Sequence, residues 1–209
     1  VDRHLCEAAV GAARLADQVG RPDLLVIGTL LHDIGKGYPG DHTVVGQELV
    51  ATMATRMGFP PADVDTLVLM VRHHLLLPDV ATRRDLGDDA TIERVAEEVG
   101  GVEALELLAA LTEADSVATG PAAWGDWKAG LVRQLVSRTA HRLGGEDGEG
   151  PRVAPFPSAE QRALMAAGER AVLVDGRTVT GVAPDRPGLF SRVAGVLALN
   201  GLDVLGAAA

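Results

Sequence analysis

The sequence predicts a mainly α-helical protein that ends in a small α+β segment. Three observations support this fold class. Apolar residues recur at helical spacing between residues 2 and 143, and no part of this range has the pattern of a strand. Hydrophobic residues make up 47% of the 209 residues but aromatic residues only 3%, so Leu, Val and Ala must build the core, which favours packed helices. Two β-like runs appear only after residue 169.

Residues that commonly begin and end helices separate the predicted helices. Pro22 lies near the start of the second helix, and Gly58 marks the end of the third. Pro60 and Pro61 open the fourth, and Asp88 or Asp89 caps the next one. The expected helices span 2–19, 22–35, 43–57, about 60–75, 89–99, 102–118 and 122–143.

The composition changes after residue 143. The stretch "GGEDGEGPRVAPFPS" (144–158) holds four Gly and three Pro and is typical of a linker. A short helix is expected near 159–167, followed by the strands "RAVLVDG" and "RTVTGVA", the helix "LFSRVAGVLALNG" and a final strand in "LDVLGAAA". One such unit cannot bury both faces of a sheet, so we expect the chain to end inside its second domain. The predicted division is 1–143, 144–170 and 171–209.

Charge and composition exclude several kinds of partner. The net charge is −10 and the pI about 5.0, which argues against nucleic acid and anionic membranes as partners. The single cysteine, Cys6, excludes an intrachain disulfide, as expected in a reducing cytoplasm. No signal peptide is visible, and no apolar run approaches the roughly 20 residues that cross a bilayer. We therefore expect a cytoplasmic protein.

Histidines and aspartates carry the chemistry in the helical region. His32 and Asp33 are adjacent, and imidazole and carboxylate groups are the ligands that hold ions such as Zn²⁺, Mn²⁺ or Fe²⁺. Neighbouring side chains point about 100° apart around a helix, so both reach one ion only where the helix end is distorted. Gly35 and Gly37 make such a distortion inexpensive.

Each of the other residues also has a purely structural interpretation. His42 stands beside the start of a helix that Asp41 or Thr43 would cap, and of the adjacent His73 and His74 one could face the core and one the solvent. Asp115 could simply end a helix, although a buried carboxylate needs a cation or a hydrogen-bond donor. Taken together, the ordered set predicts a metal site. Its candidate ligands are His4, His32, Asp33, His42, His73, His74 and Asp115.

This order resembles that of the HD-domain metal-dependent phosphohydrolases. His4, His32–Asp33 and Asp115 match the basic pattern of that family, and His42 and His73–His74 resemble the extra ligands of its two-metal members. The resemblance implies an all-helical bundle over residues 1–143. It also implies that the protein binds one or two divalent ions, which would be Mn, Mg, Fe or Zn.

Longer stretches are similar to the bifunctional uridylyltransferase/uridylyl-removing enzymes that act on the PII nitrogen-signalling protein. These stretches are "HDIGKGYPGDHT", "VRHHLLLPDVATRRDLGD", "LTEADSVATGPAAWGDWKAGLV" and "VTGVAPDRPGLFSRVAGVLALNGLDVL". The resemblance implies that a uridylyl or adenylyl group is removed from PII by phosphodiester hydrolysis. It implies no transferase domain in this chain, and an ACT domain, incomplete here, that would take glutamine as effector if complete. The competing functions are a small-molecule nucleotide phosphohydrolase and a non-catalytic module that binds nucleotide or a partner.

Further residues have predicted roles. Asp33 would bridge two metals, and Lys36 would stabilise negative charge on the phosphoryl oxygens, although a cation near a helix C-terminus is also favourable in itself. Arg83 and Arg84 are candidate substrate contacts. The loop "PDRPG" precedes a helix N-terminus and so could hold an effector carboxylate, or could simply be a tight turn. The candidate effector residues are Asp185, Gly188 and Leu189.

Overall fold

The computed structural model describes residues 2–144, 157–168 and 170–204. The chain divides into two compact units, residues 1–151 and 152–209, which are described separately. The prediction of a mainly helical protein with a small β element near the C-terminus is confirmed. Most of the predicted linker, from residue 145 to 156, lies outside the described residues.

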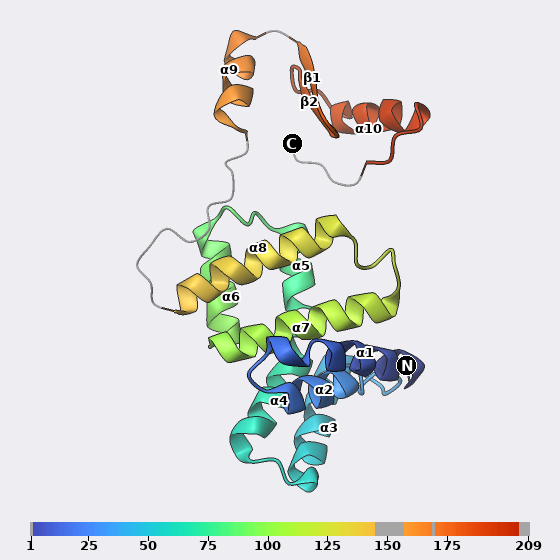
Figure 1. Ribbon diagram of the computed structural model, residues 1–209, viewed down its shortest axis with the longest axis vertical. Helices are drawn as coiled ribbons and strands as arrows, with labels where there is room; N and C mark the ends of the chain where they lie inside the picture. The colour runs from blue at the N-terminus through green and yellow to red at the C-terminus, as the bar shows by residue number, and fades with distance from the viewer. Residues whose placement is uncertain (1, 145–156, 169, 205–209) are drawn as a thin grey trace. The chain divides into compact units, whose positions relative to one another are not determined.

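The first unit consists of helices arranged on both sides of α7 (Figure 1). Its elements are α1 (Asp2–Arg14), the 3₁₀-helix η1 (Ala16–Gln18), α2 (Pro22–Leu31), α3 (His42–Met57), α4 (Pro61–His73), α5 (Leu76–Arg83), α6 (Asp89–Val99), α7 (Val102–Thr119) and α8 (Asp126–Leu143). Helices α1, α2 and α4 pack on one side of α7, with α3 against α4, and α5, α6 and α8 pack on the other side.

Two apolar cores meet at α7. Leu107 and Leu111 of α7 are buried in the core shared with α1 to α4. Leu105 and Leu108 of the same helix are buried in the core shared with α5, α6 and α8. Because both faces of α7 are buried, this helix holds the two halves of the unit together and fixes the position of its own polar residues.

Local sequence signals place several helix ends as predicted. The Asp41 side chain accepts hydrogen bonds from the backbone N–H groups of Thr43 and Val44 and so caps α3. Gly58 ends α3 in the left-handed conformation, with φ of 90°. Asp88 caps α6 through the Ala90 N–H.

Three predicted helices end earlier than expected. The helix expected over 2–19 is interrupted after Arg14 and continues as η1. The helix expected over 22–35 ends at Leu31, where i→i+3 bonds such as Lys36 N–H to the Asp33 carbonyl tighten the chain into turns.

The long helix expected to reach residue 75 is broken between α4 and α5. Pro78 explains the break, because a proline has no N–H to donate to the carbonyl four residues earlier, that of His74, and its ring would clash with it. The last residue of α4 is therefore His73, and His74 is its C-cap.

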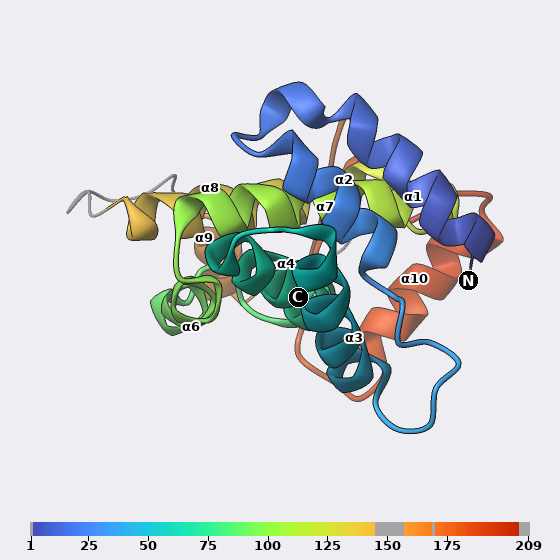
Figure 2. The ribbon, with the colours of Figure 1, turned by 90° about the horizontal axis from the view of Figure 1, so that it is seen from below.

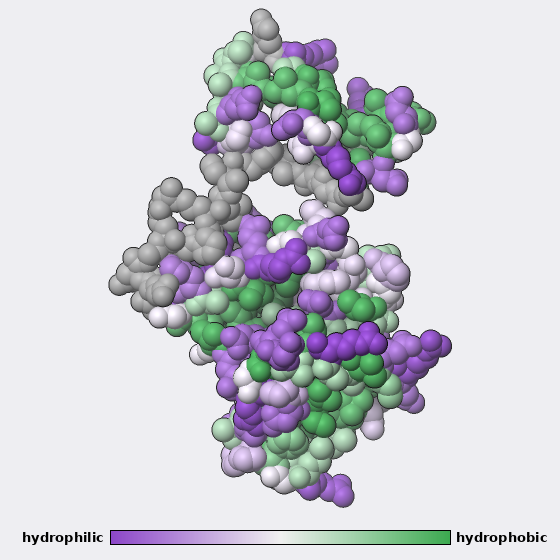
Figure 3. All heavy atoms as spheres, in the orientation of Figure 1, coloured by the Kyte–Doolittle hydropathy of each residue, from purple (hydrophilic) through white to green (hydrophobic). Residues whose placement is uncertain are grey.

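The second unit contains α9 (Ala159–Ala167), the antiparallel hairpin of β1 (Ala171–Asp175) and β2 (Thr178–Val182), and α10 (Leu189–Leu199). A capping box between Ser158 and Gln161 starts α9. The predicted final strand is not formed at residues 202–204, because no strand of the described residues pairs with them. Apolar side chains lie exposed over the hairpin and α10 (Figure 3).

Among the described residues, none of the helices combines the length and the apolar character needed to cross a membrane.

Candidate metal centre

The predicted ligands come from five separate segments of the first unit. His32 is the C-cap of α2 and is followed by Asp33, and His74 is the C-cap of α4. The remaining ligands lie on helices, His42 at the start of α3, His4 in α1 and Asp115 in α7. Figure 2 shows α1 to α4 from below, with the connection between α2 and α3 looping outward.

Asp33 belongs to two groups of candidate ligands. The first group is His4, His32 and Asp33, and the second is Asp33, His42 and His74; within each, one ligand atom per residue lies within 4.8 Å of the others. Asp33 Oδ2 lies 3.4 Å from His32 Nε2. Asp33 Oδ1 lies 3.6 Å from His74 Nε2 and 3.8 Å from His42 Nε2. One carboxylate thus presents one oxygen to each group.

His32 and His74 are oriented in the same way. Nδ1 of His32 lies 2.7 Å from the Thr29 carbonyl oxygen, and Nδ1 of His74 lies 2.7 Å from the Val71 carbonyl oxygen. A carbonyl oxygen only accepts, so in both rings Nδ1 must carry the proton that is donated. When the ring is neutral, its lone pair is on Nε2, which points into the site, as a metal ligand requires.

Close helix packing brings His4 to Asp115. A Cβ atom added to Gly11 of α1 would lie 3.4 Å from the Cα and Cβ atoms of Ala114, so the two helices approach closely through small residues. Asp115 Oδ1 consequently lies 2.9 Å from His4 Nε2 and 3.4 Å from His32 Nε2. Asp115 therefore adjoins the first group.

A second close approach places His42. A Cβ atom added to Gly35 would lie 2.0 Å from the His42 carbonyl oxygen and 2.7 Å from the Gly46 nitrogen. The turn that follows Asp33 therefore lies directly against the first turn of α3, and only glycine fits at this contact. This contact holds His42 near Asp33.

The buried groups shift one another's pKa values. Burial acts to lower the pKa of His32, but the carboxylates of Asp115 and Asp33 outweigh it and raise this pKa to about 9. Burial acts to raise the pKa of Asp33, but His32 and Lys36 bring it well below its usual range. Burial lowers the pKa of His74. The carboxylates therefore attract positive charge into a buried site.

Two buried atoms identify this site as fit for a metal ion. His32 Nε2 and Asp33 Oδ1 are buried and have no hydrogen-bond partner in the structure. Buried polar atoms are normally paired, and leaving one unpaired costs roughly 1–3 kcal/mol. A divalent cation in the first group would satisfy His32 Nε2, and one in the second group would satisfy Asp33 Oδ1. The nitrogen and oxygen donors suit Zn²⁺, Mn²⁺ or Fe²⁺. The donor set thus fits the group that the resemblance implies.

The structure does not bring every predicted ligand into these groups. His73 points elsewhere, with its Nδ1 3.6 Å from Glu98 Oε2 of α6, and it belongs to neither group. Of the two adjacent histidines, only His74 reaches Asp33. No signal in the sequence points to Glu98, which lies far along the chain from His73.

The other predicted residues take different positions. Lys36 donates a hydrogen bond to Asp33 Oδ2. Arg83 is the last residue of α5, and Arg84 follows it. Nη2 of Arg83 lies 3.6 Å from Asp79 Oδ1. No contact in the described residues joins either arginine to the two ligand groups.

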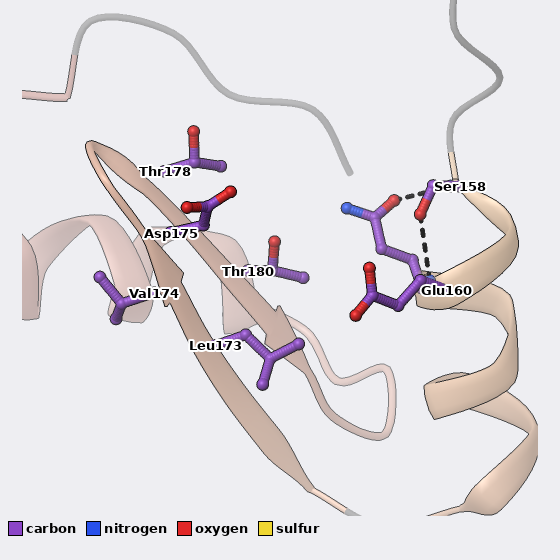
Figure 4. A pocket seen from close by; sticks show the side chains of 8 residues that line it. Ser158, Glu160, Leu173, Val174, Asp175, Thr178 and Thr180 are labelled. Carbon is purple, nitrogen blue, oxygen red and sulfur yellow. Dashed lines mark hydrogen bonds between the residues drawn. The ribbon is translucent and has the colours of Figure 1, made fainter.

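Open pockets lie among the described residues of the second unit. One, of about 500 Å³, lies between α9 and the hairpin, where Glu160 faces Thr180 and Leu173 (Figure 4). It contains no histidine and shares no residue with the ligand groups. Another, of about 200 Å³, includes the predicted effector residue Leu189. Gly188 adjoins it as the residue before α10, with φ of 78°.

The helical fold and the ordered His/Asp set define a class of protein. The HD domain family matches residues 1–120, and the chain belongs to this family. The chain is also similar to a part of larger enzymes, as predicted. It is 53% identical, over 98% of its length, to the bifunctional uridylyltransferase/uridylyl-removing enzyme of Mycobacterium tuberculosis (strain ATCC 25618 / H37Rv).

Other relatives carry the same name. The enzyme of Streptomyces coelicolor is 53% identical over 85% of this chain, and that of Azospirillum brasilense is 32% identical over 88%. The chain covers 26% of the M. tuberculosis enzyme, 20% of the S. coelicolor enzyme and 25% of the A. brasilense enzyme. It thus spans about a quarter of the length of these curated relatives.

The adjacent histidines provide a matched pair of variants. We expect His74→Ala to weaken the binding of one metal ion by about 100-fold or more. Losing a residue that only hydrogen-bonds a metal ligand already costs about 10- to 100-fold in metal affinity, and losing the ligand itself should cost more. His73→Ala should change metal affinity by less than about twofold, because His73 faces Glu98. Titration with Mn²⁺, followed by calorimetry, measures both. Equal losses in the two variants would show that the ligand assignment is wrong.

Proposed function

We propose that this chain is a metal-dependent phosphodiesterase that removes a uridylyl or adenylyl group from a tyrosine of the PII protein. The observation that carries the proposal is the sharing of Asp33 between two groups of histidines, which suits a pair of divalent ions. The name "uridylyl-removing enzyme", which the relatives carry, supports the choice of reaction.

The proposed ligands fall into two sets. His4, His32, Asp33 and Asp115 would hold one ion, and His42 and His74 would hold the other together with Asp33. The metal would be Mn, Mg, Fe or Zn. When bound, such ions neutralise phosphoryl oxygens and lower the pKa of water from about 16 towards 7.

The protein's own side chains have distinct tasks in this reaction. Asp33 would present one oxygen to each ion, and it is buried, so its charge is little screened by solvent. Lys36 is half-exposed beside Asp33, where its ammonium group can stabilise negative charge on a phosphoryl oxygen. The leaving tyrosinate has a pKa near 10, so we assign no general acid.

Two further roles remain part of the proposal. Arg83 and Arg84 would contact the substrate from the end of α5. Asp185, Gly188 and Leu189, before and at the start of α10, would bind an effector carboxylate such as that of glutamine.

The test uses the purified chain, Mn²⁺ and PII carrying the nucleotidyl group. We expect release of UMP or AMP together with unmodified PII, detected by mass spectrometry. Free nucleotides are assayed in parallel. Their hydrolysis in place of modified PII would favour a small-molecule phosphohydrolase, and no turnover despite bound metal would favour a regulatory module; either result would overturn the proposal.

A further inference from the structure

Lys36 is one of two lysines in the chain, and it is bound to the carboxylate that both ligand groups share. It follows Asp33 by three residues within the turns after α2, and its Nζ donates to Asp33 Oδ2. The Lys36 side chain is 48% exposed, whereas that of Asp33 is 3% exposed. The ammonium group thus reaches a buried carboxylate from the solvent side.

The two oxygens of Asp33 differ in their surroundings. Oδ1, which faces His42 and His74, is buried and has no hydrogen-bond partner. Oδ2, which faces His32, already accepts the hydrogen bond from Lys36. A cation that enters beside His42 and His74 therefore meets a free oxygen. A cation that enters beside His32 meets an oxygen already occupied by a positive charge.

Oδ2 of Asp33 cannot bind the Lys36 ammonium group and a metal ion at the same time. A divalent ion and an ammonium group at one oxygen would repel each other strongly in a buried site, where the charges are poorly screened. The Lys36 side chain is the part that can leave, because its flexible stem is half-exposed and partly exposed ion pairs are weak. His32 cannot leave, because its Nδ1 is bound to the Thr29 carbonyl.

We propose that Lys36 is an internal counter-cation that occupies Asp33 until a metal ion binds beside His4 and His32, and is then released towards the substrate phosphate. This inference rests on the proposed function, because it requires that the His/Asp groups bind metal. It makes Lys36 a residue that couples metal loading to phosphate binding. Such coupling ensures that the phosphate-binding cation is free only when the first group is filled.

Lysine NMR tests the release directly, since the full chain labelled with ¹³C,¹⁵N-lysine has two side chains to observe, those of Lys36 and Lys128. The Lys36→Met variant assigns the signals. We expect Zn²⁺ to shift the Lys36 signal to the position of a solvated lysine and to leave that of Lys128 unchanged. Added UMP should then shift the Lys36 signal further only when Zn²⁺ is present. A Lys36 signal that stays in place at saturating Zn²⁺ would overturn the inference.

Metal affinities provide the second measurement. Lys36→Met should bind one of the two ions about two- to fivefold more tightly than the wild type, because the competing cation is gone. Lys36→Arg, which keeps the charge, and the matched control Lys128→Met should bind as the wild type does. Weaker or unchanged binding by Lys36→Met would contradict competition. Failure of all proteins, the wild type included, to bind metal would instead refute the proposed function itself.

Discussion

Replacing Asp33 by alanine is expected to remove both metal ions and to reduce hydrolysis by about a thousandfold or more. The two oxygens of Asp33 face different histidine groups, so a single substitution removes a ligand from each. His42→Ala, by contrast, should remove only one ion, because His42 belongs to one group. Metal content by atomic emission after gel filtration, combined with the assay of the proposed function, measures both effects.

Two further variants make this result specific. Asp33→Asn keeps the size of the side chain but removes its charge, so it should also lose metal while retaining the helical circular dichroism spectrum. Asp65→Ala removes an exposed carboxylate from α4 and should retain both ions and full activity. If Asp33→Ala and Asp33→Asn both fold and keep two ions, Asp33 is not the shared ligand.

Gly35→Ala is expected to lower the free energy of unfolding by about 1–3 kcal/mol and to weaken metal binding at the His42 group. The new methyl group would lie 2.0 Å from the His42 carbonyl oxygen, so either the turn or the first turn of α3 must move. That movement increases the separation between His42 Nε2 and Asp33 Oδ1, which is already 3.8 Å. Urea denaturation of the metal-free protein and a Mn²⁺ titration measure the two effects.

Gly130 provides the matched control. It lies inside α8, and a Cβ atom added there would meet no atom within 4 Å. Gly130→Ala should therefore stabilise the protein by about 0.5–1 kcal/mol through helix propensity, with no change in metal affinity. A Gly35→Ala variant that gains stability in the same way would show that the contact between the turn and α3 is not tight.

Local signals were sufficient for much of the fold. Asp41 and Gly58 mark the two ends of α3 through hydrogen bonds within a few residues of themselves, so their effect can be predicted from the sequence. The break at His74 also has a local cause in Pro78, although helical periodicity alone suggested a longer helix. The strand expected in "LDVL" was wrong for residues 202–204, because a strand exists only through its pairing with another.

Local periodicity and the order of the candidate ligands along the chain were enough to predict the family, the helical class and the residue types of the candidate metal site. Which histidine of the adjacent pair faces Asp33 depends instead on how the helices pack. His73 and His74 have nearly the same local sequence, but α4 ends between them and α6 places Glu98 beside the first. The two oxygens of Asp33 likewise have different neighbours because the turn after Asp33 packs against α3. Contacts of this kind, between segments distant in the chain, depend on how the helices pack.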